Sequence, residues 1–263
     1  MFAKRCLLLS LFIGTSLALA DGPSPTYTAA GIVNAADYAA GQLAPNTLAS
    51  IFGTGLAYIT KSATQADIRG GLLPTVLPGT GVHVLVGNLP ANILYVSPKQ
   101  INFLVPSSLL PGTVNVQVVL DSIAGPAIPV QILPSAPALF LLSPGVAVAT
   151  QADGSLENDA SPARPEGYAI LYATGLGDTI PSVPYGEIPS GAAPIVDMAD
   201  FQVTLDGVPV DRSRVEYAGV TPGFGGLYQI NLKLPPGFNP NPEIRVGFPA
   251  LLSPAGVRLP AQP

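Results

Sequence analysis

Hydrophobic and polar residues alternate in short runs along the chain. Residues 82–86 read Val-His-Val-Leu-Val, and residues 201–205 read Phe-Gln-Val-Thr-Leu. A period of two places successive side chains on opposite faces, so each run predicts a strand. Gly87-Asn88 and Asp206-Gly207 follow these runs, and both dipeptides predict tight hairpin turns because they tolerate positive φ. Further strands are expected at residues 48–52, 91–96, 113–120, 127–133, 168–172, 243–248 and 256–259.

Helical periodicity is weak throughout. Only residues 34–40 and 62–69 could hold a helical turn, because prolines interrupt most other windows. Glycine and proline separate short apolar runs, as turns separate strands. Six or seven short strands in each half of the chain predict an all-β protein made of sandwiches.

Two motifs occur twice and in the same order. Gln-Ile-Asn begins at Gln100 and again at Gln229, and a Thr-Gly-Leu motif contains Gly55 and again Gly175. Order and approximate spacing are both kept, which indicates one β-module written twice. We therefore expect two tandem Ig-like antiparallel β-sandwiches, domain 1 over residues 21–140 and domain 2 over residues 141–263. The boundary segment, residues 135–144, is apolar, so we expect it to pack between the halves.

The first twenty residues have the pattern of a signal peptide, and we assign residues 1–20 to it. Lys4 and Arg5 precede an apolar run over residues 7–19, and Ala18-Leu19-Ala20 is a small-residue cleavage site. The run is shorter than the roughly 20 apolar residues of a membrane anchor, although an uncleaved anchor is the alternative. We expect cleavage after Ala20 and a secreted or extracytoplasmic protein, in the periplasm or at the cell surface.

Composition narrows the partners. Cleavage removes Cys6, the one cysteine, so the mature chain can form no disulfide and offers only His83 to a zinc site. Removing Lys4 and Arg5 lowers the net charge from −5 to −7. No basic cluster remains, so we expect no nucleic-acid partner. No second long apolar run exists, so we expect no membrane span after cleavage.

Residue chemistry argues against an enzyme. A Ser-His-Asp triad needs a histidine base, and His83 lies inside an alternating strand, where a solvent-facing or satisfied side chain is the expectation. Paired carboxylates could support glycoside hydrolysis, but the acidic residues are interpreted as solvated turn residues. We expect no catalytic residue, no bound metal and no cofactor. The glutamates considered are Glu157, Glu166, Glu187, Glu216 and Glu243.

A calcium loop is an alternative at Asp153 to Asp159. Oxygen-bearing side chains occur there at alternate positions, as calcium would need. The glycine comes too early for a calcium loop, and a β-turn at Asp153-Gly154 explains the same residues. The two Gly-Thr-Gly motifs lack the lysine and the helix of a phosphate loop, so we interpret them as turns at strand ends.

The second copy carries a glycine-rich insertion that the first copy lacks. Gly223, Phe224, Gly225 and Gly226 lie between its Thr-Pro pair and Gln229. We expect Phe224 to be exposed and this loop to be a partner-binding loop. Carbohydrate binding would need a flat aromatic face, but most tyrosines of the second copy sit in strand patterns, where core packing is expected. These tyrosines are Tyr168, Tyr172, Tyr185, Tyr217 and Tyr228.

Longer motifs give the chain a family resemblance. Parts of the first copy resemble the Ig-like modules known as IPT/TIG domains, at residues 45–56, 82–90, 100–106 and 111–114. The whole chain from about Tyr27 resembles the Solibacter-type C-terminal domain family, a tandem module of secreted bacterial proteins. The motifs that carry this second resemblance are residues 31–36, 94–103, 173–177 and 226–231.

The resemblance implies an Ig-like fold, an extracytoplasmic place and no catalytic residues. This chain departs from the family's usual setting because no large domain precedes the module, which leaves open whether it acts alone or as a subunit. We expect a non-enzymatic module for adhesion or protein interaction at the cell surface or in the periplasm. The alternative is a carbohydrate-binding module, so the expected partner is a protein or an envelope polysaccharide.

Overall fold

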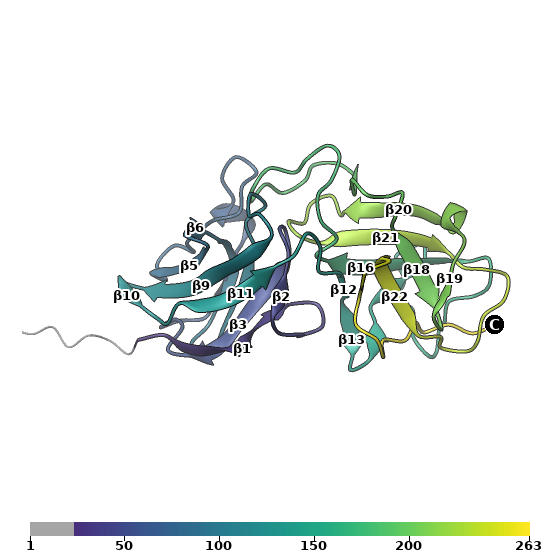
Figure 1. Cartoon of the computed structure of the whole chain (residues 1–263), viewed down its shortest axis with the longest axis horizontal. Helices are drawn as coiled ribbons and strands as arrows, with labels where there is room; N and C mark the ends of the chain where they lie inside the picture. The colour runs from purple at the N-terminus through teal and green to yellow at the C-terminus, as the bar shows by residue number, and fades with distance from the viewer. Residues whose placement is uncertain (1–23) are drawn as a thin grey trace, which may run out of the picture.

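The computed structural model describes residues 24–263, and the expected signal peptide lies outside them. Over that range the protein consists of strands, two short 3₁₀ helices and loops, without an α-helix. Within residues 24–263, no helix is long and apolar enough to cross a membrane. Two sheet-rich halves lie end to end along the long axis (Figure 1). The prediction of an all-β sandwich protein is confirmed.

The first half, residues 24–133, contains two sheets. The β8 sheet has the strand order β1-β3-β8-β7-β4, and the β9 sheet has the order β2-β11-β9-β5-β6, with β10 beside β9. Strands β2 and β11 are parallel, and the other pairs are antiparallel. The bounds are β1 (Thr26–Asn34), β2 (Gln42–Leu43), β3 (Leu48–Thr54), β4 (Lys61–Ser62), η1 (Gln65–Asp67), β5 (Val82–Val86), β6 (Leu89–Pro90), β7 (Asn92–Val96), β8 (Gln100–Leu104), β9 (Gly112–Leu120), β10 (Ile123–Ala124) and β11 (Ile128–Ile132).

The second half, residues 138–263, repeats this plan with shorter edges. The β21 sheet has the order β12-β16-β21-β20-β17, with β15 beside β16, and the β18 sheet has the order β19-β18-β22-β23. A two-stranded ribbon, β13-β14, completes the half. The bounds are β12 (Ala138–Leu139), β13 (Leu141–Ser143), β14 (Val146–Ala147), β15 (Ala149–Thr150), β16 (Tyr168–Thr174), β17 (Ala193–Pro194), β18 (Gln202–Leu205), β19 (Val208–Pro209), η2 (Arg212–Arg214), β20 (Val215–Val220), β21 (Tyr228–Lys233), β22 (Ile244–Phe248) and β23 (Leu251–Leu252).

Each half encloses a hydrophobic core of its own. Ile101 and Phe103 point inward from β8, and Ile230 and Leu232 point inward from β21, all fully buried. The glutamine and asparagine of each Gln-Ile-Asn motif alternate with them and therefore lie on the outer face. The repeated motif thus has one core-facing and one outward-facing set of side chains in both halves.

Both expected hairpin turns are present. Gly87 and Asn88 have φ of +57° and +68°, and Asp206 and Gly207 have +48° and +78°. Positive φ at both central residues is the requirement of a type I′ turn, which matches the twist of the flanking strands. These turns connect β5 to β6 and β18 to β19.

Two local expectations differ from the structure, and one strand was not expected. The segment 256–259 forms only isolated bridges at Arg258, because Leu251 and Leu252 occupy the edge of the β18 sheet instead. Residues 34–40 form a turn rather than a helical turn, whereas residues 62–69 do hold a helical turn, the 3₁₀ helix η1. The first strand, β1, was missed because its alternation is interrupted by small residues. Its pairing with β3 shifts register between Tyr27 and Ile32.

The second half begins three residues before the expected boundary at residue 141. Ala138 and Leu139 pair with Thr174 and Ala173, and Leu139 is buried in the second core. Ala136, just before this strand, is bonded to both halves. Its N donates to Gly175 O at 2.8 Å, and its O accepts from Asn34 Nδ2 at 3.3 Å. The connecting segment is therefore fixed between the halves.

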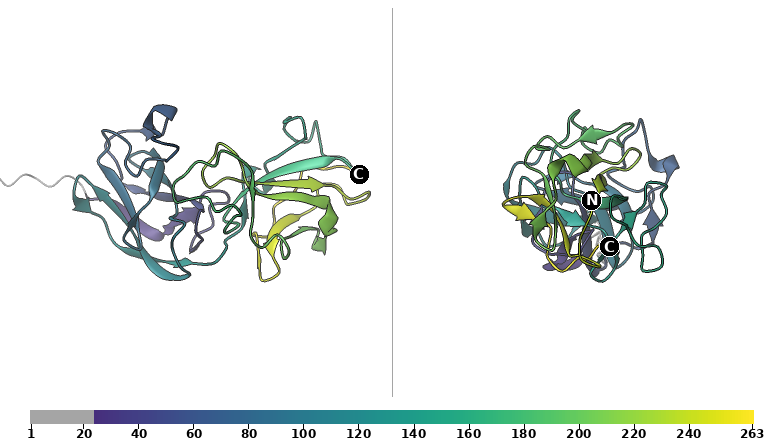
Figure 2. Two further views of the ribbon diagram at one scale, coloured as in Figure 1. Left: turned by 90° about the horizontal axis from the view of Figure 1, so that it is seen from above. Right: turned by 90° about the vertical axis from the view of Figure 1, so that its right-hand side faces the viewer.

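Hydrogen bonds across the joint dock the halves on each other. Thr174 Oγ1 accepts from Leu48 N at 2.9 Å and donates to Gly226 O at 2.8 Å. A long loop of the second half also reaches back, where Leu73 N donates to Gly186 O at 2.8 Å. Figure 2 shows the ribbon narrowing where the halves meet. Backbone groups carry most of these bonds, so the joint has a fixed geometry.

Candidate functional site

The glycine-rich loop of the second copy lies at this joint. Gly223 and Phe224 are exposed, with Phe224 at 59% of its maximal exposure, as expected. Gly225 and Gly226 are buried against the first half instead. The proposed partner-binding loop is therefore divided into an exposed tip and a buried base.

The base of the loop needs glycine for two reasons. Gly226 has φ of +76°, and a Cβ added there would collide with Leu104 and press on Leu48. A Cβ at Gly225 would lie 2.8 Å from Leu73 Cδ1. The backbone of this loop thus approaches the first half more closely than any side chain would permit. Gly223 N donates to Pro189 O at 2.8 Å, which fixes the tip as well.

An apolar groove of about 470 Å³ lies beside Phe224. Both halves contribute to it, so it exists only because they are docked. The 3₁₀ helix η1 supplies its few polar groups at one side, including Gln65. Its apolar lining comes from Leu48, Ala63, Ile68, Leu73 and Leu94 of the first half and from Phe140, Ile188, Phe224 and Leu227 of the second.

A second cleft between the halves is larger, at about 740 Å³. Leu110 projects into the solvent beside it with 80% exposure. Three aspartates line it, Asp178, Asp197 and Asp200. Over residues 24–263, no group of three or more His, Cys, Asp or Glu side chains is placed to hold a metal ion.

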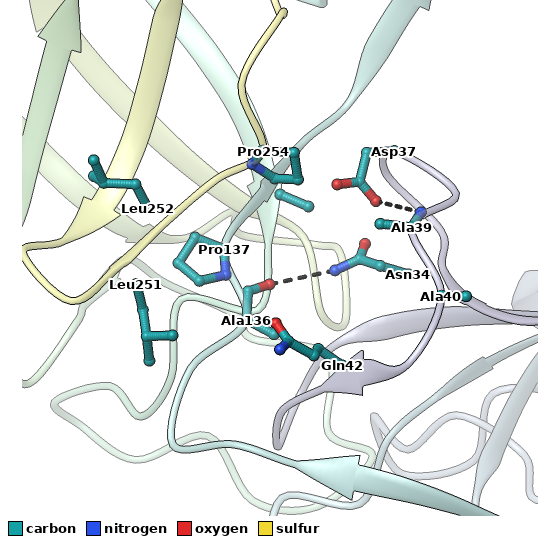
Figure 3. A pocket seen from close by; sticks show the side chains of 11 residues that line it. Asn34, Asp37, Ala39, Ala40, Gln42, Ala136, Pro137, Leu251, Leu252 and Pro254 are labelled. Carbon is teal, nitrogen blue, oxygen red and sulfur yellow. Dashed lines mark hydrogen bonds between the residues drawn. The ribbon is translucent and has the colours of Figure 1, made fainter. Parts of the chain in front are cut away.

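A third, small pocket of about 120 Å³ separates the end of β1 from β23 (Figure 3). Asn34 points across it to Ala136, and Asp37 turns back to accept a hydrogen bond from Ala39 N at 2.9 Å. Burial raises the pKa of the Asp37 carboxyl, although the bond from Ala39 opposes this shift. The pocket has room for water molecules but not for a sugar or a peptide.

The sequence candidates for catalysis lie apart from these clefts or have other partners. His83 is exposed on β5, as expected for a solvent-facing strand histidine. Glu166 forms ion pairs with Arg214 at 3.0 Å and Lys233 at 3.7 Å. Glu216 accepts a hydrogen bond from the Tyr168 hydroxyl at 2.8 Å. Glu243 Oε2 accepts from Gly256 N at 2.8 Å, so three of the five glutamates serve surface contacts.

Glu157 departs from the expectation of a solvated turn residue. Its side chain is fully buried, and neither carboxyl oxygen has a hydrogen-bond partner among the described residues. Its backbone pairs with Ala149, whose side chain lies in the second core. Burial without a partner raises the pKa of the Glu157 carboxyl to about 8. Glu157 follows polar turn residues in the sequence, so the sequence pattern did not indicate that it is buried.

The segment from Asp153 to Asp159 uses its oxygens locally. Asp153 Oδ1 accepts from Ser155 N at 2.9 Å and from Ser155 Oγ at 2.6 Å. Asn158 Oδ1 accepts from Ala160 N at 2.9 Å. These are the hydrogen bonds of Asx turns, so the turn interpretation accounts for the residue pattern.

The expectation that most tyrosines of the second copy pack in the core is wrong for three of them. Tyr228 is fully buried, but Tyr168, Tyr172 and Tyr217 are half-buried on the outer face of the β21 sheet. In β16 the inward positions belong to the smaller residues Ala169 and Ala173 and to Leu171. Both faces of this strand carry apolar side chains, so the alternation did not reveal which face was buried.

Comparisons with known proteins give weak structural likenesses only. Neither a protein-family model nor a curated protein matches the chain. SGBP-B of a Bacteroides ovatus mixed-linkage glucan utilization locus, in complex with a mixed-linkage heptasaccharide, is 12% identical over 92% of this chain and 43% of that chain, with a TM-score of 0.36. The surface glycan-binding protein PbSGBP-B of Prevotella bryantii is 13% identical over 90% and 42%, with a TM-score of 0.27. Domains 5–6 of the S-layer protein SbsC are 11% identical over 90% and 98%, with a TM-score of 0.29.

The chain spans less than half the length of the first two of these proteins. Likenesses at this level carry no conclusion about a ligand.

Proposed function

We propose that this protein is a non-enzymatic, extracytoplasmic module that binds another macromolecule in the groove beside Phe224. The observation that carries the proposal is a large aromatic side chain left 59% exposed on a loop whose backbone is held at both ends. An anchor on a fixed loop loses little conformational freedom on binding. The apolar lining of the groove favours a protein segment with apolar side chains over a sugar.

The remaining parts of this proposal rest on the sequence pattern and on the placement of the reactive side chains. The basic, apolar and small-residue order of the first twenty residues supports export. His83 is exposed on a strand, and Glu166 and Glu216 make surface contacts. None of these three side chains is held in a cleft as an activated group, which supports a role without catalysis.

The first experiment compares the purified protein with its Phe224→Ala variant in a pull-down from envelope proteins. Tyr58→Ala is the matched control, because Tyr58 is 53% exposed and does not line the groove. We expect Phe224→Ala to reduce capture of a saturable partner about tenfold or more, which is the typical loss at a buried aromatic anchor. Equal capture by the protein and by Phe224→Ala would contradict the proposal.

Carbohydrate binding is the second candidate function. The observation that favours it is the set of half-buried tyrosines on the outer face of the β21 sheet, Tyr168, Tyr172 and Tyr217. They supply an aromatic surface that core packing would have removed. Co-sedimentation with purified cell-wall polysaccharide separates the two functions. Saturable sugar binding that Phe224→Ala leaves unchanged would place the sugar on another surface.

A further inference from the structure

The two Gln-Ile-Asn motifs present the same side-chain arrangement on the outer faces of their sheets. In the first half, Gln100 lies opposite Phe52, and Asn102 lies opposite Tyr95. In the second half, Gln229 lies opposite Tyr172. Tyr217 lies opposite Asn231 in the same half. Each motif thus places two amide side chains between aromatic residues of the neighbouring strands.

The amides are joined in the same way in both copies. Gln100 Nε2 donates to Asn102 Oδ1 at 2.8 Å, and Gln229 Nε2 donates to Asn231 Oδ1 at 2.7 Å. This bond fixes the orientation of both side chains. It leaves the glutamine Oε1 as an acceptor and the asparagine Nδ2 as a donor, and neither atom has a protein partner among the described residues. None of these atoms is among the buried unpaired ones, so water or a ligand reaches them.

The aromatic side chains of the second half lie along this face. The Tyr217 side chain extends over Gly219, and a Cβ added at Gly219 would lie 2.6 Å from the Tyr217 hydroxyl. This hydroxyl donates to Val220 O at 2.8 Å. Tyr172 lies on the other side of Gln229, with its hydroxyl 3.4 Å from Thr150 Oγ1. Two partly exposed tyrosines therefore flank one amide pair.

The first half presents a related surface with more aromatic exposure. Phe52 is 38% exposed, and Tyr38 is 59% exposed beside it, with ring centroids 6.0 Å apart. Ser50 lies opposite Asn102 on β3, and its Oγ donates to Asn102 Oδ1 at 2.9 Å. The position equivalent to Ser50 is Ile170 in the second half, so the two surfaces differ in detail.

Charged residues lie near these faces but not within the amide–aromatic sets. Lys233 and Glu166 pair at one end of the β21 sheet, and Glu216 accepts from Tyr168. The amide–aromatic sets themselves contain no charged residue. The faces therefore offer unpaired amide donors and acceptors beside aromatic rings, without a charge to attract an ionic ligand.

We propose that these two faces are a pair of binding sites for a neutral glycan, one in each half. Each sugar hydroxyl both donates and accepts, which matches the unpaired Nδ2 and Oε1 of each amide pair. The C–H face of a sugar ring is apolar and packs on an aromatic side chain.

Calorimetric titration with neutral oligosaccharides tests this inference. The panel contains gluco-, xylo-, manno- and galacto-oligosaccharides, with oligogalacturonate as the charged comparison. We expect one or more neutral members to saturate the protein at two sites per chain. Gln229→Met combined with Tyr172→Ala removes the second site, and Gln100→Met combined with Phe52→Ala removes the first. Each pair lowers the stoichiometry to one, and all four substitutions together abolish binding.

Gln202→Met is the matched control, because Gln202 is a half-buried strand glutamine of β18 outside both faces. Circular dichroism and thermal unfolding confirm that each variant is folded. The proposal is overturned if no neutral oligosaccharide saturates the protein, if the fourfold variant still binds, or if the unsubstituted protein has only one site. The groove beside Phe224 is tested separately by protein capture, so either proposal can fail without the other.

Discussion

Thr54 and Thr174 occupy equivalent positions in the two repeats, yet their surroundings are opposite. Each ends a central strand, β3 or β16, and each precedes a glycine with positive φ, Gly55 or Gly175. Thr54 is exposed, whereas Thr174 is fully buried and bonds to both the first half and the glycine-rich loop. The end of the same strand is therefore free in the first half and contacts the other half in the second.

The loops that precede the two Gln-Ile-Asn motifs also differ between the halves. In the first half, β7 and β8 are joined by a tight turn in which Ser97 N donates to Gln100 O at 2.7 Å. In the second half, residues 221–227 join β20 to β21, and this longer loop carries Gly225 and Gly226 into the first half. The longer loop of the second half therefore supplies part of the joint, whereas the outward-facing amide pairs are alike in both halves.

The buried carboxyl of Glu157 gives the largest expected difference between the halves. No carboxylate is buried among the described residues of the first core, so only the second half should respond strongly to pH. The folded pKa of about 8 exceeds the ordinary value of 4.5, so the folded state binds more protons than the unfolded state between these values. Stability therefore falls as pH rises from about 4.5 to about 8, by roughly 3–5 kcal/mol in total.

Urea unfolding of the protein at pH 5 and pH 9, followed by circular dichroism, measures this loss. Glu157→Gln should flatten the pH profile, because the amide cannot ionise. Equal stability of the protein at both pH values would contradict the burial of Glu157.

Removing the Thr174 hydroxyl should give the next largest effect. Thr174→Val leaves Leu48 N and Gly226 O without their partner at the joint and should cost about 2–3 kcal/mol. Thr54→Val is the matched control, and because Thr54 is exposed it should change stability by less than about 0.5 kcal/mol. Urea unfolding of both variants checks this pair, and similar losses in the two would mean that the joint contributes little.

Two glycines of one loop provide a finer comparison. Gly223→Ala and Gly226→Ala both place alanine at positive φ, but only Gly226 faces Leu104 and Leu48, whereas Gly223 has open space. The Gly226 variant should therefore be less stable than the Gly223 variant by about 1–2 kcal/mol. Thermal unfolding of the two variants gives the difference directly, and small-angle X-ray scattering reports whether the halves separate.

The sequence predicted the elements that depend on local chemistry. The Gly-Asn and Asp-Gly turns follow from backbone preference, and the exposed Phe224 follows from its place in a glycine-rich insertion. Strand β1 and the edge strand β23 did not follow, because a strand at a sheet edge is decided by what packs beside it.

The candidate sites were harder to predict, because they depend on register and docking. Gln100 and Gln229 were recognised as a repeat, but their partners across the sheet come from strands that only pairing identifies. The groove beside Phe224 needs Leu48 and Leu94 from the other half. A stronger sequence signal was available for the tyrosines, since Ala169 and Ala173 alternate with them and small residues suit a crowded interior.

The fixed joint has a mechanical consequence. The beginning of β1 and the C-terminus lie at opposite ends of the long axis (Figures 1 and 2). A pull on the two ends therefore loads both sandwiches and the joint in series. The bonds of Thr174 and the backbone bonds of Ala136 and Gly186 lie across that line of force. A module joined in this way transmits tension between whatever it connects, as a stiff spacer of constant length rather than a flexible tether.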